Sequence, residues 1–148
     1  LFSFSACDND DDYMPPNQDI ITALKQLYPD VQDIEWSQKG VYYVADCWVD
    51  GSELDVWFDA NANWIMTEME IFREQLPAAV NTAYEESGYG DWVIDNLTKL
   101  TFPHKSEEFV FEVQRGAQER ALYYSAYGGL LLEKDITDAD DTHWPDVE

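Results

Sequence analysis

Residues 42–60, YYVADCWVDGSELDVWFDA, decide the fold of this chain. Two runs rich in aromatic and β-branched residues flank Asp50-Gly51. An Asp-Gly pair between two such runs is typical of a β-hairpin with a two-residue turn. The stretch therefore predicts two antiparallel strands, whose side chains point alternately to the two faces of a sheet.

The alternation divides the hairpin side chains into two sets. We expect the first set to face a helix: Tyr43, Ala45, Cys47, Leu54, Val56 and Phe58. The second set then lies on the opposite face: Tyr42, Val44, Asp46, Trp48, Asp55 and Trp57. A single helix covers one face of a sheet and leaves the other to solvent or to a partner.

Outward from the hairpin, the chain reads as one helix and four strands, twice over. The first helix has Asn17 as its N-cap candidate and stops at Pro29, and the second begins near Pro77 and stops at Gly88. An offset of 66 aligns the strands, for example Phe58 with Tyr124. The predicted fold is α+β: two tandem helix-plus-four-strand antiparallel repeats form one long bent sheet with the helices on one face.

These patterns also predict the domain organisation. The tandem domain spans residues 19–137, with repeats at about 19–71 and 72–137. An N-terminal segment, 1–18, precedes it, and an acidic tail, 138–148, follows. We expect Trp144 either to pack the tail back on the domain or to stay mobile with it.

Charge and motifs restrict the function. The net charge of −23 disfavours nucleic acid and anionic lipid and favours solvation, a basic partner or cations. The sequence has no phosphate-binding loop, nucleophile elbow or metal-ligand spacing, and no apolar run long enough to span a bilayer. The only histidines, His104 and His143, read as solvated loop residues. We predict no catalytic residue, no metal and no cofactor.

The N-terminal sequence FSAC, followed by acidic residues, resembles the end of a bacterial lipoprotein signal. The resemblance implies that Cys7 is lipidated, and that the protein is anchored to the outer membrane or cell surface, with the periplasm as second choice. A tail without this function is the alternative, and a calcium loop at Asp8, Asp10 and Asp12 is another, although Tyr13 stands where such a loop needs Gly. Cys47 reads as a small buried hydrophobe, without a disulfide to Cys7.

Three stretches, LYPDVQDIEW, YYVADCWVDGSELDVWFDANANWI and LPAAVNTAYEE, resemble the PepSY-like, beta-lactamase-inhibitor-like family of secreted bacterial proteins. The resemblance covers about residues 19–136. Ala62-Asn63 replaces the glycine usual in the first turn motif, whereas Gly128-Gly129 keeps it in the second. The family resemblance implies that the chain is an envelope protein, and that it binds other proteins on a concave sheet face as related tandem folds do.

The predicted function is therefore a non-enzymatic envelope lipoprotein that binds a protein or peptide, including a basic one, on the open sheet face. Its predicted binding residues are Tyr42, Trp48, Trp57 and Tyr123, with Glu112 on the same face. Alternatively, these rings cover one another, or are buried by the tail or a second copy. Inhibition of an envelope hydrolase of the protease or beta-lactamase type, through the loops FPHKSEE or VDGSE, is the second hypothesis. An enzyme with a carboxylate pair and a calcium-responsive structural module are the others, and the partner's identity and the oligomeric state stay open.

Overall fold

A computed structural model describes residues 16–139 and 142–145 of the chain. In the first half, helix α1 (Gln18–Leu27) precedes four strands: β1 (Gln32–Lys39), β2 (Tyr42–Val49), β3 (Ser52–Phe58) and β4 (Trp64–Glu70). A short 3-10 helix, η2 (Arg73–Gln75), and helix α2 (Ala78–Glu85) follow. The last four strands are β5 (Val93–Thr101), β6 (Glu108–Arg115), β7 (Gln118–Ser125) and β8 (Leu130–Asp135).

The predicted α+β class is confirmed. The eight strands are hydrogen-bonded in the order of the chain, β1 to β8, and neighbouring strands run antiparallel. The chain forms two compact units, which meet within β4, between Thr67 and Glu68. Residues 16–67 are the described part of the N-terminal unit, and residues 68–139 and 142–145 are that of the C-terminal unit.

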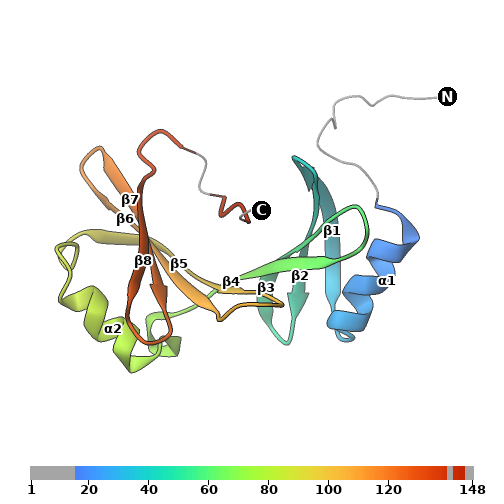
Figure 1. The fold of residues 1–148 in the computed structure, drawn as a ribbon, viewed down its shortest axis with the longest axis horizontal. Helices are drawn as coiled ribbons and strands as arrows, with labels where there is room; N and C mark the ends of the chain where they lie inside the picture. Colours follow the sequence, from blue (N-terminus) through green and yellow to red (C-terminus); the bar gives the residue numbers. More distant parts are fainter. Residues whose placement is uncertain (1–15, 140–141, 146–148) are drawn as a thin grey trace. The chain divides into compact units, whose positions relative to one another are not determined.

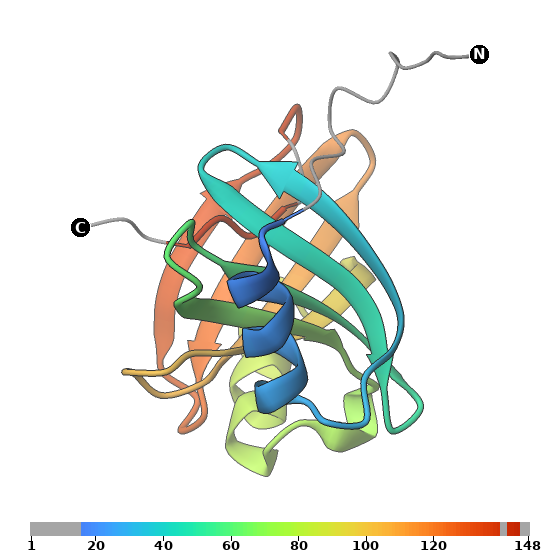
Figure 2. The same cartoon turned by 90° about the vertical axis from the view of Figure 1, so that its right-hand side faces the viewer.

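In the N-terminal unit, α1 lies beside β1 and β2 (Figure 1, Figure 2). Asn17 caps it as predicted, because its side-chain oxygen accepts a hydrogen bond from the Ile20 amide at 3.1 Å. Ile20 and Leu24 are fully buried. Beyond the helix end, the Tyr28 hydroxyl is 3.0 Å from the Thr67 hydroxyl, which ties this end of α1 to β4.

The hairpin of β2 and β3 has the predicted register. Val49 pairs with Ser52, and both intervening residues have positive φ, 51° at Asp50 and 81° at Gly51, as a type I′ turn requires. Ala45 pairs with Val56 on one face, and Val44 pairs with Trp57 on the other.

In the C-terminal unit, α2 packs on one face of β6 and β7. The ring of Tyr84 from α2 stacks on Phe111 of β6 with centroids 4.2 Å apart, and Phe111 meets Tyr124 of β7 edge to face at 5.6 Å. Val80, one turn before Tyr84, is buried in the same cluster. The opposite face carries the alternate residues of these strands, including Glu112 of β6 and, on β7, Ala121 opposite it and Tyr123.

The turns after β3 and β7 have the same backbone hydrogen bonds. The Asp59 amide donates to the Asn63 carbonyl at 3.0 Å, and the Ser125 amide donates to the Gly129 carbonyl at 2.9 Å. At the equivalent positive-φ position, Ala62 has φ 66° and Gly128 has φ 87°. Ala62 therefore occupies a conformation that usually favours glycine.

Candidate binding site

Two of the predicted binding residues, Tyr42 and Trp57, are on the predicted face but are buried. Trp57 has no exposed surface. Its ring meets that of Tyr42 edge to face with centroids 5.6 Å apart, and the Lys39 ammonium lies 5.9 Å from its centroid. The expectation that these two rings are accessible is therefore wrong, because cross-strand neighbours cover one another on this face. Whether they contribute to binding stays a prediction.

Trp48 is accessible, as predicted. Its side chain is 42% exposed at the end of β2. With residues of the loop before β1, the start of β1 and the turn after β2, it lines a pocket of about 400 Å³ whose other lining residues are Asp30, Gln32, Asp33, Asp50 and Gly51. Its role in binding a partner stays a prediction.

Tyr123 lies on the face opposite α2, beside Glu112, as predicted, but it is buried. The C-terminal segment, residues 142–145, covers it. The Tyr123 hydroxyl is 2.8 Å from Nδ1 of His143, and the two rings meet edge to face with centroids 5.5 Å apart. The alternative in which the tail buries rings of this face therefore applies to Tyr123.

His143 joins Tyr123 to Glu112. Nε2 of the imidazole is 2.8 Å from Oε2 of Glu112, and both residues are only 5% exposed. The two atoms are not aligned for a hydrogen bond with each other, and neither has a hydrogen-bond partner elsewhere among the described residues. The contact is therefore mainly electrostatic and is strongest when the imidazole is protonated.

A small pocket remains beside this contact, with a volume of about 280 Å³. Lys134 of β8 lines it and holds its ammonium 5.2 Å from the centre of the Tyr123 ring. Trp144 also lines it, but its side chain is 45% exposed. The site thus combines a buried carboxylate, a tyrosine hydroxyl and an aromatic ring in one concave surface.

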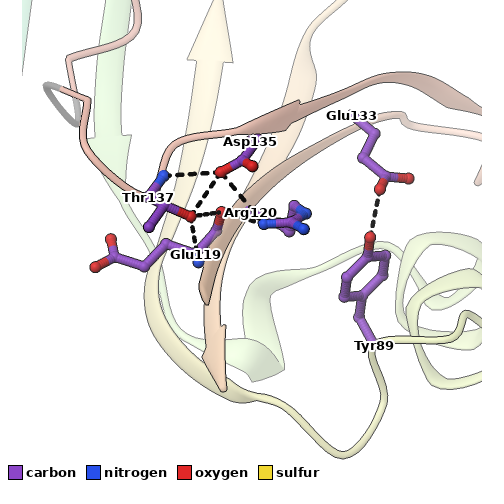
Figure 3. Close-up of polar contacts among 6 residues, drawn as sticks. All are labelled: Tyr89, Glu119, Arg120, Glu133, Asp135 and Thr137. Atoms are coloured by element: carbon purple, nitrogen blue, oxygen red, sulfur yellow. Dashed lines mark hydrogen bonds and ion pairs between the residues drawn. The ribbon is translucent and has the colours of Figure 1, made fainter. Parts of the chain in front are cut away.

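Polar contacts at the end of β8 fasten the start of the segment that leads to the pocket (Figure 3). Asp135 accepts hydrogen bonds from the amide and the hydroxyl of Thr137, at 3.0 and 2.6 Å, and also pairs with Arg120 of β7. The Thr137 hydroxyl accepts from the Glu119 amide at 3.1 Å. The two hydrogen bonds from Thr137, followed by the charge of Arg120, lower the pKa of the Asp135 carboxyl. Figure 3 also shows Tyr89 donating to Glu133 of β8.

His143 was not among the predicted site residues. It was predicted to be a solvated loop residue, and Trp144 was considered the anchor of the tail. The structure corrects the expectation for His143, which is buried, whereas Trp144 lines the same pocket with 45% of its side chain exposed. The available signal was the strand alternation, which placed a carboxylate and a tyrosine, two possible partners of a histidine, on one face.

The remaining predicted residues give no second site. Cys47 is a buried free thiol, as predicted, and burial, followed by the charges of Asp46 and Asp55, raises its pKa to about 12. His104 is exposed. Among residues 16–139 and 142–145, no group of three or more His, Cys, Asp or Glu side chains could hold a metal ion. Cys7 and the aspartates of the calcium-loop hypothesis lie outside the described residues.

Comparisons with known proteins identify relatives of this chain. The family described as "Putative beta-lactamase-inhibitor-like, PepSY-like" matches residues 41–132. A BLIP-like protein from Bacteroides fragilis is 56% identical, with a TM-score of 0.87, over 95% of this chain and all of that chain. The comparison with curated proteins gives no match.

Two more distant solved structures have the same fold. A DUF2874 family protein from Bacteroides ovatus is 28% identical, with a TM-score of 0.83, over 86% of this chain and 93% of that chain. A protein from Bacteroides eggerthii, described as a putative periplasmic protein, is 30% identical, with a TM-score of 0.82, over 86% and 94% of the two chains. Within the described residues of this chain, no helix is both long and apolar enough to cross a membrane.

Proposed function

The chain belongs to the beta-lactamase-inhibitor-like, PepSY-like family, and on this premise we propose that it is a non-enzymatic protein of the cell envelope that binds a protein or peptide partner. The observation that carries the proposal is the seat of residues 142–145. This extended segment lies on the sheet face opposite α2 and inserts His143 between Glu112 and Tyr123. A surface that accommodates a peptide of its own chain has the shape and chemistry to accommodate another.

The accessible aromatic side chains support the same proposal. Trp48 in the N-terminal unit and Trp144 in the C-terminal unit each line a pocket with polar or acidic neighbours. Aromatic residues in pockets are the typical anchors of protein interfaces. The net charge of −23 favours a basic partner, because long-range attraction accelerates encounter.

Replacement of Trp48 tests this proposal. Immobilised wild-type protein should retain a partner from envelope extract, and Trp48→Ala should retain at most about a tenth as much if Trp48 is an anchor worth about 1.4 kcal/mol or more. Phe72→Ala is the matched control, because Phe72 is an exposed aromatic residue outside the strands. Trp57→Ala is unsuitable, since truncating a fully buried tryptophan costs about 3–5 kcal/mol of stability. Equal retention by the wild type, Trp48→Ala and Phe72→Ala would reject Trp48 as an anchor.

We also propose that the two halves are tandem copies of a helix-plus-four-strand unit. The matching hydrogen bonds after β3 and β7, and the positive φ at Ala62 and Gly128, support this proposal. Each copy then has one face that its own helix does not cover.

For the location, we propose an extracytoplasmic protein anchored through lipid at Cys7. The FSAC sequence and the description of the Bacteroides eggerthii relative as periplasmic support it. Mass spectrometry of protein from native membranes should find Cys7 as an acylated N-terminus. An unmodified Cys7 preceded by residues 1–6 would reject the anchor.

Inhibition of an envelope hydrolase is the second candidate function, favoured by the family description. Two projecting turns could enter an active site. Residues 103–106 are exposed between β5 and β6, and Asp50-Gly51 forms the exposed turn between β2 and β3. Assays against a panel of beta-lactamases and envelope proteases would detect it, and full enzyme activity at about 10 μM protein, where a complex with micromolar Kd is mostly formed, would exclude it for that panel.

A further inference from the structure

The pocket at Glu112 and Tyr123 has the composition of a site for a basic side chain. Glu112 is a buried carboxylate on β6, and Oε2 has no hydrogen-bond donor among the described residues. The basic group in contact with it is the His143 imidazole, which carries a charge only when it is protonated. Since an uncompensated buried charge is strongly unfavourable, the site requires a cation or a donor at this position.

We infer that this pocket recognises an extended peptide that inserts a basic side chain between Glu112 and Tyr123, and that His143 is an intramolecular ligand competing for the same position. The inference rests on the proposed function and specifies the chemistry of its partner. It goes beyond that function because the tail becomes a regulator of access to the site.

Three features of the pocket support a replaceable ligand in this position. The tyrosine hydroxyl can donate to a neutral imidazole or accept from a cationic side chain, so it suits either occupant. The remaining volume of about 280 Å³ would accommodate a side chain longer than histidine. Trp144, the next residue of the segment, lines the pocket with 45% of its side chain exposed, so its ring is only partly enclosed there.

The charges around the pocket also favour a basic occupant. Glu112 faces it from β6, Tyr123 from β7, and Lys134 and Asp135 from β8. Lys134 is directed to the Tyr123 ring, and Asp135 is bound by Thr137 and Arg120, so Glu112 is the carboxylate left for the ligand. A lysine or arginine, unlike histidine, would keep its charge at any physiological pH.

Competition by a tethered segment can be estimated. Tethering a ligand close to its site gives it an effective concentration of the order of 1 mM. If the free peptide binds with a Kd of about 10 μM, occupation in cis weakens binding of an external peptide about a hundredfold. Removing the imidazole from the tail should therefore raise the affinity for an external peptide by the same factor.

The test uses full-length protein and three fluorescein-labelled hexapeptides with the sequence of residues 141–146, Asp-Thr-Xaa-Trp-Pro-Asp, in which Xaa is His, Arg or Ala. Fluorescence anisotropy gives the affinity of each. We expect His143→Ala to bind the Arg and His peptides about a hundredfold more tightly than the wild type does. The Ala peptide should bind at least about tenfold more weakly than the Arg peptide, because it leaves Glu112 unpaired. When the pH is raised from 5.5 to 8, the affinity of the His143→Ala protein should fall only for the His peptide, because the peptide imidazole loses its charge in this range.

Matched variants locate the effect. In the His143→Ala background, Glu112→Gln should weaken the Arg peptide about tenfold, whereas Glu35→Gln, at an exposed position on β1, removes the same charge and should change its affinity less than about twofold. Equal affinity for the three peptides, no binding of any at about 1 mM, or equal effects of the two glutamine variants would overturn the inference.

A measurement on the wild type keeps the test valid if His143→Ala fails to fold. Saturation with the Arg peptide should shift the Trp144 indole NMR signal, assigned by its loss in Trp144→Phe, because the tail leaves the pocket. Peptide binding with an unshifted indole signal would reject competition. If the peptides do not bind at the Glu112 pocket but wild-type protein still captures a partner through Trp48, the proposed function stands and this inference fails. If the peptides bind as expected but no partner is captured, the proposed function fails and the pocket stands.

Discussion

Replacing His143 by alanine should destabilise the C-terminal unit by about 3 kcal/mol. When the imidazole is protonated, the contact is an ion pair between atoms 2.8 Å apart. Because each charge is spread over its group, we take a separation of about 4 Å between the two charges. At the effective dielectric of a protein, about 20, such a pair attracts by about 4 kcal/mol. Desolvation of the two groups offsets much of this attraction in the intact protein, but removing one partner leaves the other buried and uncompensated, which typically costs 3–5 kcal/mol. We take the lower end of this range, about 3 kcal/mol, because the tail can open and allow water to reach Glu112.

The companion variant Glu112→Met isolates the electrostatic part. Methionine has a similar length without the charge, so the double variant with His143→Ala should lie within about 1–2 kcal/mol of the wild type, as replaced buried pairs often do. A cycle of the two single variants and the double variant should therefore give a coupling energy of about 2–3 kcal/mol.

Urea unfolding followed by circular dichroism measures the global stability, and hydrogen exchange of amides in β6 and β7 reports on the C-terminal unit specifically. Both readouts are needed because a chain with two compact units need not unfold in one step. A His143→Ala variant within about 0.5 kcal/mol of the wild type, or a coupling energy near zero, would show that the contact does not hold the tail.

The remaining predictions concern two turns and a thiol. Ala62→Gly should stabilise the protein by about 0.5–1 kcal/mol in thermal or urea unfolding, because relief of the positive φ exceeds the entropic cost of glycine. Gly128→Ala should destabilise the protein, because the new Cβ would lie 2.7 Å from the Ala79 carbonyl oxygen. A destabilised Ala62→Gly variant would contradict the first expectation. Cys47, with a pKa of about 12 against 9.0 for the free thiol, should not react with Ellman's reagent at pH 8 until the chain unfolds, and rapid reaction of native protein would refute its burial. Because the unfolded thiol ionises first, Cys47 should also reduce stability as pH rises from about 9 to 12.

The pocket at Glu112 suggests how a strongly acidic protein could control its own binding. In the proposed scheme, an external basic peptide gains access only when it outcompetes His143, so weak and nonspecific cations are rejected. The tail then sets an affinity threshold without any change in the sheet.

Local features were predictable from the sequence alone. The Asp50-Gly51 turn and the alternation around it predicted the register of β2 and β3, because a two-residue turn leaves no freedom in pairing. Likewise, Asn17 and Leu24 predicted the start and the buried stripe of α1. These features depend on neighbours a few residues apart, which a single sequence displays.

Which face of the sheet is exposed was decided only by the tertiary structure. Alternation placed Trp57 and Tyr123 on the face opposite the helix-facing residues, but burial depends on what lies over that face: an adjacent ring and lysine stem for Trp57, and a segment distant in sequence for Tyr123. His143 has no local pattern that marks it as buried. Only folding brings it to Glu112, where a carboxylate out of reach of water makes the imidazole the favourable neighbour.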